Sequence, residues 1–110
     1  MAIFGGWRSV WLIVMFDLPT DTAAARADYR RFREFLMDDG FHRLQFSVYA
    51  RHCASDENSD FHKQRVLVSL PPDGEVRLLS LTDKQFGRME VRFGRIHRIS
   101  ESPPEQVMLL

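Results

Sequence analysis

The stretch Val10-Trp11-Leu12-Ile13-Val14-Met15-Phe16 is the longest apolar run in the chain. Its middle is β-branched and Asp17-Leu18-Pro19 stops it, a pattern typical of a central strand that is buried on both faces. The run is about a third of the roughly twenty residues that a membrane span needs. The charged Arg8 precedes it without a signal-peptide cleavage pattern. The sequence therefore predicts a buried strand here, and neither export nor membrane insertion.

A helical pattern follows this strand. Its apolar residues recur every three or four positions, at Ala25, Tyr29, Phe32 and Leu36. This spacing predicts a helix from Thr22 to Asp39 that buries one face. Asp21 or Thr22 can cap its start, and Gly40 can end it in the left-handed conformation.

The next segments alternate between strand and helix. Residues 41–51 have apolar side chains at every second position and predict a strand that is long enough to be bent or split in two. Residues 53–60 are polar and predict a loop, with Ser59 or Asp60 as the cap of a second helix that runs to about Leu70. The residues Pro71-Pro72-Asp73-Gly74 predict a turn, and residues 75–82 alternate again as a fourth strand.

The order strand, helix, strand pair, helix, strand is the split βαβ pattern. It predicts an α+β fold over residues 10–82, a ferredoxin-like βαββαβ sandwich with both helices on one face of an antiparallel sheet. Beyond it, the sequence predicts a short turn at Gln85-Phe86 and a further strand over residues 89–93. We expect a single domain over 1–110, with a lead-in over 1–9, a core over 10–93 and a tail over 94–110.

The tail ends in four apolar residues that need burial: Val107, Met108, Leu109 and Leu110. An extra C-terminal strand on the sheet edge of a second chain would bury them. These four residues are therefore the predicted dimer interface, and the chain is predicted to be a homodimer.

Composition sets broad limits on function. The chain has 110 residues, 45% of them hydrophobic with nine Phe, which suits one domain with one packed core. Cys53 is the only cysteine, so an intrachain disulfide and a multi-cysteine zinc site are both excluded, which fits a reducing cytoplasm. The formal net charge is zero, with 15 basic and 15 acidic residues, so global charge does not argue for a nucleic-acid partner.

The distribution of arginine does suggest such a partner. Arg26, Arg30 and Arg33 lie at intervals of four and three, so they form one basic stripe on the predicted first helix. Arg88 and Arg92 belong to a second run of spaced cations near the end of the chain. Both sets could bind phosphates, because the guanidinium fork matches phosphate geometry. The alternative is an ordinary solvated helix face.

Asp17 ends the first strand and is the candidate catalytic and metal-binding residue. The alternative is a turn-forming aspartate, which is common before proline. One carboxylate makes a poor Mg²⁺ site, but a dimer axis close to this position would bring in a second Asp17. The four histidines, His42, His52, His62 and His97, are too far apart for a helical metal pair, and we expect them at the surface or on strands.

Two segments resemble a known family. The stretch IVMFDLPTDTAAARADYRRFREFLMDDGFHRLQFSVYAR, residues 13–51, is similar to the opening half of the Cas-two family, the small dimeric protein of CRISPR adaptation. The likeness lies in the strand that ends in Asp17, the Arg-rich helix and the QFSVY stretch of residues 45–49. Residues 81–89, LTDKQFGRM, resemble the branch that accompanies single-protein RNA-guided effector nucleases.

The resemblance implies a ferredoxin-like homodimer whose C-terminal strand pairs with the partner's sheet. This dimer bridges dimers of the CRISPR integrase protein and binds a double-stranded DNA prespacer. That role in spacer acquisition is the main hypothesis. Some family members are described as Mg²⁺-dependent endonucleases on RNA or double-stranded DNA, with the aspartate that matches Asp17 holding the ion across the dimer. Endonuclease activity is therefore the alternative, and an interaction module without nucleic acid is the third.

Overall fold

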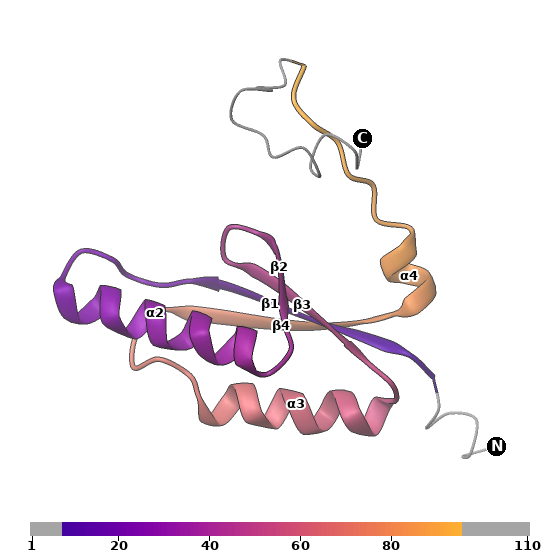
Figure 1. The fold of residues 1–110 in the computed structure, drawn as a ribbon, viewed down its shortest axis with the longest axis horizontal. Helices are drawn as coiled ribbons and strands as arrows, with labels where there is room; N and C mark the ends of the chain where they lie inside the picture. Colours follow the sequence, from indigo (N-terminus) through magenta and orange to yellow (C-terminus); the bar gives the residue numbers. More distant parts are fainter. Residues whose placement is uncertain (1–7, 96–110) are drawn as a thin grey trace.

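The computed structural model describes residues 8–95 and has two layers, one of strands and one of helices (Figure 1). Its elements are β1 (Val10–Asp17), α2 (Ala23–Asp38), β2 (His42–Gln45), β3 (Val48–Cys53), α3 (Asp56–Val68), β4 (Glu75–Thr82) and α4 (Asp83–Gly87). The strands lie in the order β2-β3-β1-β4, with each neighbouring pair antiparallel. The predicted α+β, ferredoxin-like fold is confirmed.

Strand β1 divides the molecule into two faces. Because successive side chains of a strand point to opposite sides, Leu12, Val14 and Phe16 share one face. They pack there with Phe32 and Leu36 of α2, and all five side chains are at most 7% exposed. The other face carries Trp11, Ile13 and Met15, and in the described chain only the short helix α4 contacts it, at Trp11. The predicted central strand is confirmed, but it is not fully buried on both faces, because Trp11 and Met15 are partly exposed.

The two strands after α2 are separated by a strained turn. Residues 41–51 were predicted as one long strand or two, and the chain does split, into β2 and β3. Ser47 lies in the turn with φ 63°, a left-handed conformation that is uncommon for a residue with a side chain. A bulge between Arg43 and Gln45 shifts the register just before it.

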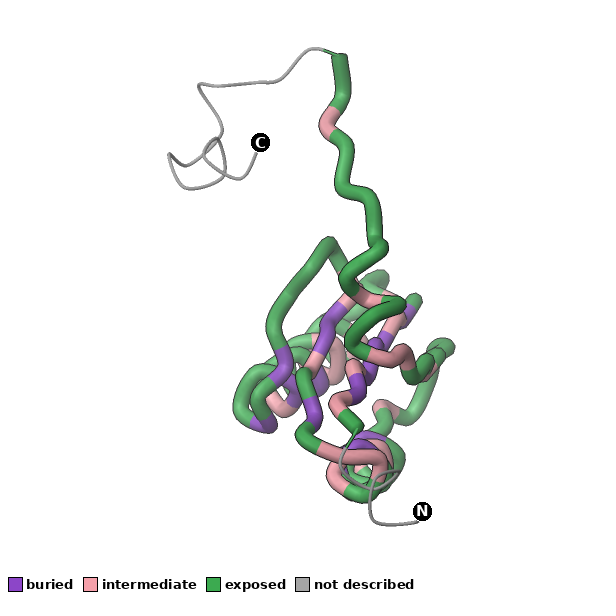
Figure 2. Tube along the Cα trace, turned by 90° about the vertical axis from the view of Figure 1, so that its right-hand side faces the viewer, coloured by how far each residue is buried: buried purple, intermediate pink, exposed green. Residues whose placement is uncertain are grey.

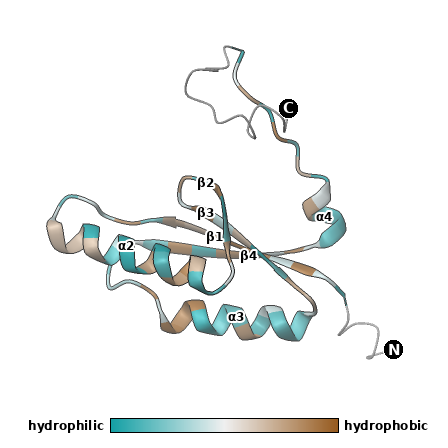
Figure 3. Cartoon of the chain, viewed as in Figure 1, coloured by the Kyte–Doolittle hydropathy of each residue, from teal (hydrophilic) through white to brown (hydrophobic). Residues whose placement is uncertain are grey.

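Helix α2 begins where it was predicted, and helix α3 begins earlier than predicted. Thr22 caps α2 as predicted, its hydroxyl accepting the Ala25 N–H at 3.0 Å. Helix α3 begins at Asp56, after the cap Ser55, so the predicted loop over 53–60 and the predicted caps Ser59 and Asp60 are wrong. Ser59 is instead buried inside the helix. Figure 3 shows why the start was missed, because most of α3 is hydrophilic and its apolar residues gather at the end next to β4.

A buried polar cluster joins the ends of the two helices. Asp39 lies just past α2, and its Oδ1 accepts a hydrogen bond from Arg65 Nε at 2.7 Å while its Oδ2 lies 2.8 Å from His62 Nδ1. Its backbone carbonyl accepts from Arg51 Nε at 2.7 Å. His62 is buried, so the prediction that it lies at the surface or on a strand is wrong. A buried carboxylate needs such partners, and here they tie α2 to α3 and to β3.

Helix α4 is held against the start of β1. Trp11 stacks on Phe86 with ring centroids 4.0 Å apart, and its Nε1–H donates to Asp83 Oδ1 at 2.8 Å. After α4 the chain runs away from the sheet in an exposed, extended path (Figure 2). Residues 89–93 form no strand in the described chain, contrary to prediction, because the path lies beside no strand with which it could pair. The predicted interface at Val107, Met108, Leu109 and Leu110 lies outside the described residues.

No helix among residues 8–95 is long and apolar enough to cross a membrane.

Candidate active site at the end of strand β1

Asp17, the predicted catalytic and metal-binding residue, is exposed at the last position of β1. Its side chain follows Ile13 and Met15 in the strand alternation, so it belongs to the face opposite α2 and α3, at the other end of β1 from the contact of Trp11 with α4. The carboxylate is therefore accessible from the open side of the sheet. No group of three or more His, Cys, Asp or Glu side chains suited to a metal ion occurs within the part of the chain that the structure describes.

A second carboxylate lies across from Asp17. Glu75, the first residue of β4, is its register partner in the β1–β4 ladder, and directly opposed residues project from the same face. Glu75 Oε1 accepts a hydrogen bond from Arg77 Nε at 2.9 Å. That hydrogen bond and the charge of Arg77 lower the pKa of Glu75 from its ordinary value, so the carboxylate stays ionised to lower pH. Sequence reasoning missed Glu75, because only the strand register brings it to Asp17.

The turn before β4 is pressed against the backbone of Asp17. Gly74 has φ +98°, and a Cβ placed there would lie 2.8 Å from the Asp17 carbonyl oxygen and 2.6 Å from Leu18 Cδ2. Only glycine tolerates both the left-handed conformation and this close approach. The turn predicted at residues 71–74 is confirmed, and its close contact restricts the backbone where the chain leaves β1 at Asp17 and Leu18.

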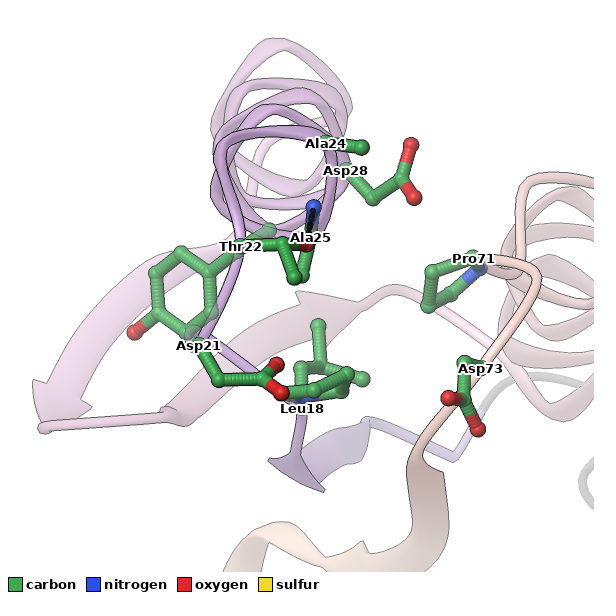
Figure 4. Close-up of a pocket in the computed structure, with 10 residues that line it drawn as sticks. Leu18, Asp21, Thr22, Ala24, Ala25, Asp28, Pro71 and Asp73 are labelled. Atoms are coloured by element: carbon green, nitrogen blue, oxygen red, sulfur yellow. Dashed lines mark hydrogen bonds between the residues drawn. The ribbon is translucent and has the colours of Figure 1, made fainter.

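A hollow of about 320 Å³ lies just beyond Asp17, between the start of α2 and the turn before β4. Three carboxylates line it, from Asp21, Asp28 and Asp73 (Figure 4). They come from three different segments and stand apart from one another around the hollow. A rim of negative charge repels phosphate, so this hollow is a poor place for a nucleic-acid backbone.

The predicted arginines fall into two separate regions. Arg26, Arg30 and Arg33 are exposed along α2, and Arg26 Nη1 also donates to the Thr20 carbonyl at 3.0 Å. Arg88 and Arg92 are exposed in the segment after α4, where Arg92 is paired with Glu90 at 2.9 Å. The first group belongs to the helix layer and the second to the extended segment, so the structure does not combine them into one patch.

The open face of the sheet carries an apolar hollow of about 600 Å³. Its apolar lining consists of Ile13, Met15, Leu44, Val48, Leu79, Leu81, Met89 and Val91. Leu79 and Met89 are each 47% exposed and Val91 is 64% exposed, although apolar side chains gain free energy when they leave water. Asp17 lies at the end of this same face.

Comparison with known proteins identifies relatives over nearly the whole chain. The family model of the CRISPR associated protein Cas2 matches residues 10–89. A protein of Parvibaculum lavamentivorans named CRISPR-associated endoribonuclease Cas2 is 50% identical over 91% of this chain and 99% of its own length. Proteins of the same name from Flavobacterium psychrophilum and Paracidovorax avenae are 45% and 41% identical, and cover 94% and 92% of this chain and 90% and 94% of their own lengths.

Proposed function

Because this chain belongs to the CRISPR-associated Cas2 family, we propose that it is a Mg²⁺-dependent endoribonuclease that acts as a homodimer. The resemblance of this chain to the family is thereby confirmed, and the branch suggested by residues 81–89 stays a prediction. The names of its relatives favour the nuclease alternative over the adaptor hypothesis. The observation that carries the proposal is the exposed carboxylate of Asp17 at the end of β1, with Glu75 beside it in register.

The donor chemistry of this site fits Mg²⁺. The ion takes six oxygens and usually binds through one or two carboxylates with water filling the other positions. Asp17 and Glu75 supply carboxylate oxygens and no softer ligand. One chain offers few of the six oxygens, so a second Asp17 from a partner chain would make the site stronger.

The open face supports the homodimer. Exposed apolar side chains on the sheet face opposite α2 and α3 favour association, and a second copy of the chain brings the same face. Packing these faces together would bury Leu79 and Met89 and would bring the Asp17 ends of two sheets toward one interface. The predicted pairing of residues 107–110 with the partner chain stays a prediction.

In the proposed reaction the chain's own residues hold the ion and the RNA. Asp17 would bind Mg²⁺, which when bound lowers the pKa of a coordinated water and neutralises charge on the scissile phosphate. Arg77 would keep Glu75 ionised beside it, which favours cation binding. The exposed arginines of α2 would bind the backbone phosphates, a contact that carries no sequence preference.

The adaptor role in spacer acquisition is the second candidate, and the α2 stripe favours it. Arg26, Arg30 and Arg33 are exposed on one helix and need no metal to bind double-stranded DNA. In that role the dimer would bridge two dimers of the CRISPR integrase protein and hold the prespacer duplex. Asp17 would then be dispensable.

One residue separates the two candidates. Asp17→Asn and Asp17→Ala should abolish Mg²⁺-dependent cleavage of RNA by the purified dimer, with Asp21→Asn as the matched control for a neighbouring exposed carboxylate. Isothermal titration with Mg²⁺ should show the same loss of binding. Spacer integration with the integrase protein should persist in both Asp17 variants. Cleavage that survives in a folded Asp17→Ala dimer would contradict the nuclease proposal, and lost integration would contradict a metal-free adaptor.

A further inference from the structure

The β2–β3 turn holds an aromatic ring in water. Phe46, directly before Ser47, is 72% exposed, more than any other aromatic side chain among residues 8–95. Exposing an aromatic ring to water is unfavourable, so contact of this ring with a partner or a ligand would gain free energy.

The turn is strained and well supported. Ser47 keeps its left-handed φ of 63° while its carbonyl accepts the Phe16 N–H at 3.0 Å and its Oγ lies 3.2 Å from the Tyr29 hydroxyl. Strained residues of this kind concentrate at functional sites, because surrounding structure has to hold them. The bond from Phe16 also places the turn at the end of the sheet where Asp17 lies.

Two side chains flank the Phe46 ring without covering it. The Tyr29 ring lies 6.1 Å away at an interplanar angle of 26°, and the Arg43 guanidinium carbon lies 5.9 Å from the ring centroid. Phe46 is 72% exposed even with the Tyr29 and Arg43 side chains beside it, so most of the ring surface is open to a ligand.

The basic stripe of α2 runs along the same side. Tyr29, which contacts Phe46, lies three residues after Arg26 and four before Arg33, so all three share one strip of the helix. The opposite flank of α2 faces the end of α3, where Asp28 and Phe35 line a hollow together with residues 69–72. The arginines therefore lie on the flank that faces the β2–β3 turn.

We propose that Phe46 stacks on an unpaired base of single-stranded RNA while the α2 arginines bind its phosphates. Aromatic rings beside a basic path are the usual means of binding single strands, since every base has a face for stacking. Bases inside a duplex are already stacked on each other and cannot use the ring. The inference rests on the proposed function for its choice of RNA, and it adds a base-stacking residue to that function.

Three variants test the ring itself. Phe46→Ala should weaken binding of a single-stranded RNA by about 5- to 150-fold, the range that corresponds to one stacked base. Phe46→Leu should lose nearly as much, because it keeps apolar bulk without a π-face, and Phe46→Trp should bind as tightly as the native chain. A 2-aminopurine in the RNA reports stacking directly through its fluorescence.

The matched control is Phe61→Ala on α3. Phe61 is 57% exposed and also has an arginine over its ring, Arg65 at 5.7 Å, but it lies away from the α2 stripe. The Phe61→Ala variant should bind single-stranded RNA as tightly as the native chain does. Double-stranded RNA of the same sequence should bind all of these variants equally.

The outcomes are distinct. Equal losses for single-stranded and double-stranded RNA, or native binding by Phe46→Leu, would overturn the proposal. So would dissociation of the dimer in Phe46→Ala, measured by light scattering, because the ring would then belong to an interface between copies. Binding measured in EDTA requires neither Mg²⁺ nor cleavage, so failure of the nuclease proposal leaves the stacking result readable.

Discussion

The two faces of the sheet differ in how completely they are packed. On one face, Leu12 and Val14 are fully buried under α2 and α3 together with Leu36 and Val66. On the other, Leu79 remains 47% exposed, and among the described residues only the short helix α4 contacts that face, at Trp11. The same strand, β1, supplies both faces, and its last residue on the open face is Asp17.

This difference separates folding from function within one strand. The side chains of the covered face are buried within the monomer, so their packing contributes most of the free energy of unfolding. The open face leaves apolar surface and two adjacent carboxylates, Asp17 and Glu75, without a covering layer. Exposed apolar surface next to polar groups is where partners and ligands bind. Substitutions on the covered face should therefore change stability, and those on the open face should change association or binding.

The largest expected effect comes from the covered face. Leu12→Ala should lower the free energy of unfolding by about 2–5 kcal/mol, because it leaves a cavity in a fully packed core. Urea unfolding should give the same loss at low and high protein concentration. A loss well under 1 kcal/mol would mean that the core is not packed as described.

Leu79→Ala is the matched substitution on the open face. In the monomer it should cost less than about 1 kcal/mol, because the side chain is half exposed. Its effect on stability should grow with protein concentration if the open face joins two copies, since association then contributes to stability. An effect that is independent of concentration would separate the open face from the dimer.

The polar cluster in the helix layer should have the next largest effect. Asp39→Ala removes the acceptor of both Arg65 and His62, and we expect a loss of about 2–3 kcal/mol in thermal or urea unfolding. The neighbouring Asp38→Ala is the control, because Asp38 is exposed and should change stability by less than about 0.5 kcal/mol. Equal effects of the two variants would show that the cluster does not join the helices.

The sequence was sufficient for elements whose pattern is local. Strand β1, helix α2 with its cap Thr22, the turn at residues 71–74 and strand β4 were predicted from apolar runs, periodicity and turn residues. Helix α3 began earlier than predicted because its buried residues are Ser59, His62 and Val66, and two of these three are polar. A hydrophobic pattern cannot reveal a helix face that is buried through hydrogen bonds.

The site was only half predictable for a related reason. Asp17 stands out because it ends an apolar run. Glu75 is distant in sequence and reaches Asp17 only through the antiparallel register of β1 with β4. Phe46 looked like part of a strand, and only the left-handed Ser47 turns it outward into water.

A smaller effect is expected where the turn meets Asp17. Gly74→Ala should cost about 1–3 kcal/mol, because it strains the left-handed backbone and forces a Cβ against the Asp17 carbonyl. Because the strain falls on Asp17, Mg²⁺ affinity should drop as well, measured by isothermal titration. Gly87→Ala is the control, since a Cβ there meets nothing within 4 Å. Unchanged stability and Mg²⁺ affinity in Gly74→Ala would contradict the described contact.

The smallest effect concerns the charge beside Asp17. Arg77 lowers the pKa of Glu75 through a hydrogen bond and its charge, so Arg77→Gln should raise that pKa toward its ordinary value. A carboxylate with a lowered folded-state pKa stabilises the fold above its unfolded pKa, and that contribution is lost as the pH falls through the folded value. Both side chains are exposed, so the change should appear in a carboxyl NMR titration of Glu75 rather than in unfolding.

Arg92→Gln is the control for this titration, because Arg92 pairs with Glu90 and should leave the pKa of Glu75 unchanged. If Glu75 assists Asp17, Mg²⁺ affinity in Arg77→Gln should begin to fall at a higher pH than in the native chain, since protonation of Glu75 removes its charge. At neutral pH, where Glu75 is ionised in both proteins, the two affinities should be close. If the pKa of Glu75 is the same in Arg77→Gln as in the native chain, then Arg77 does not control the ionisation of Glu75 beside Asp17.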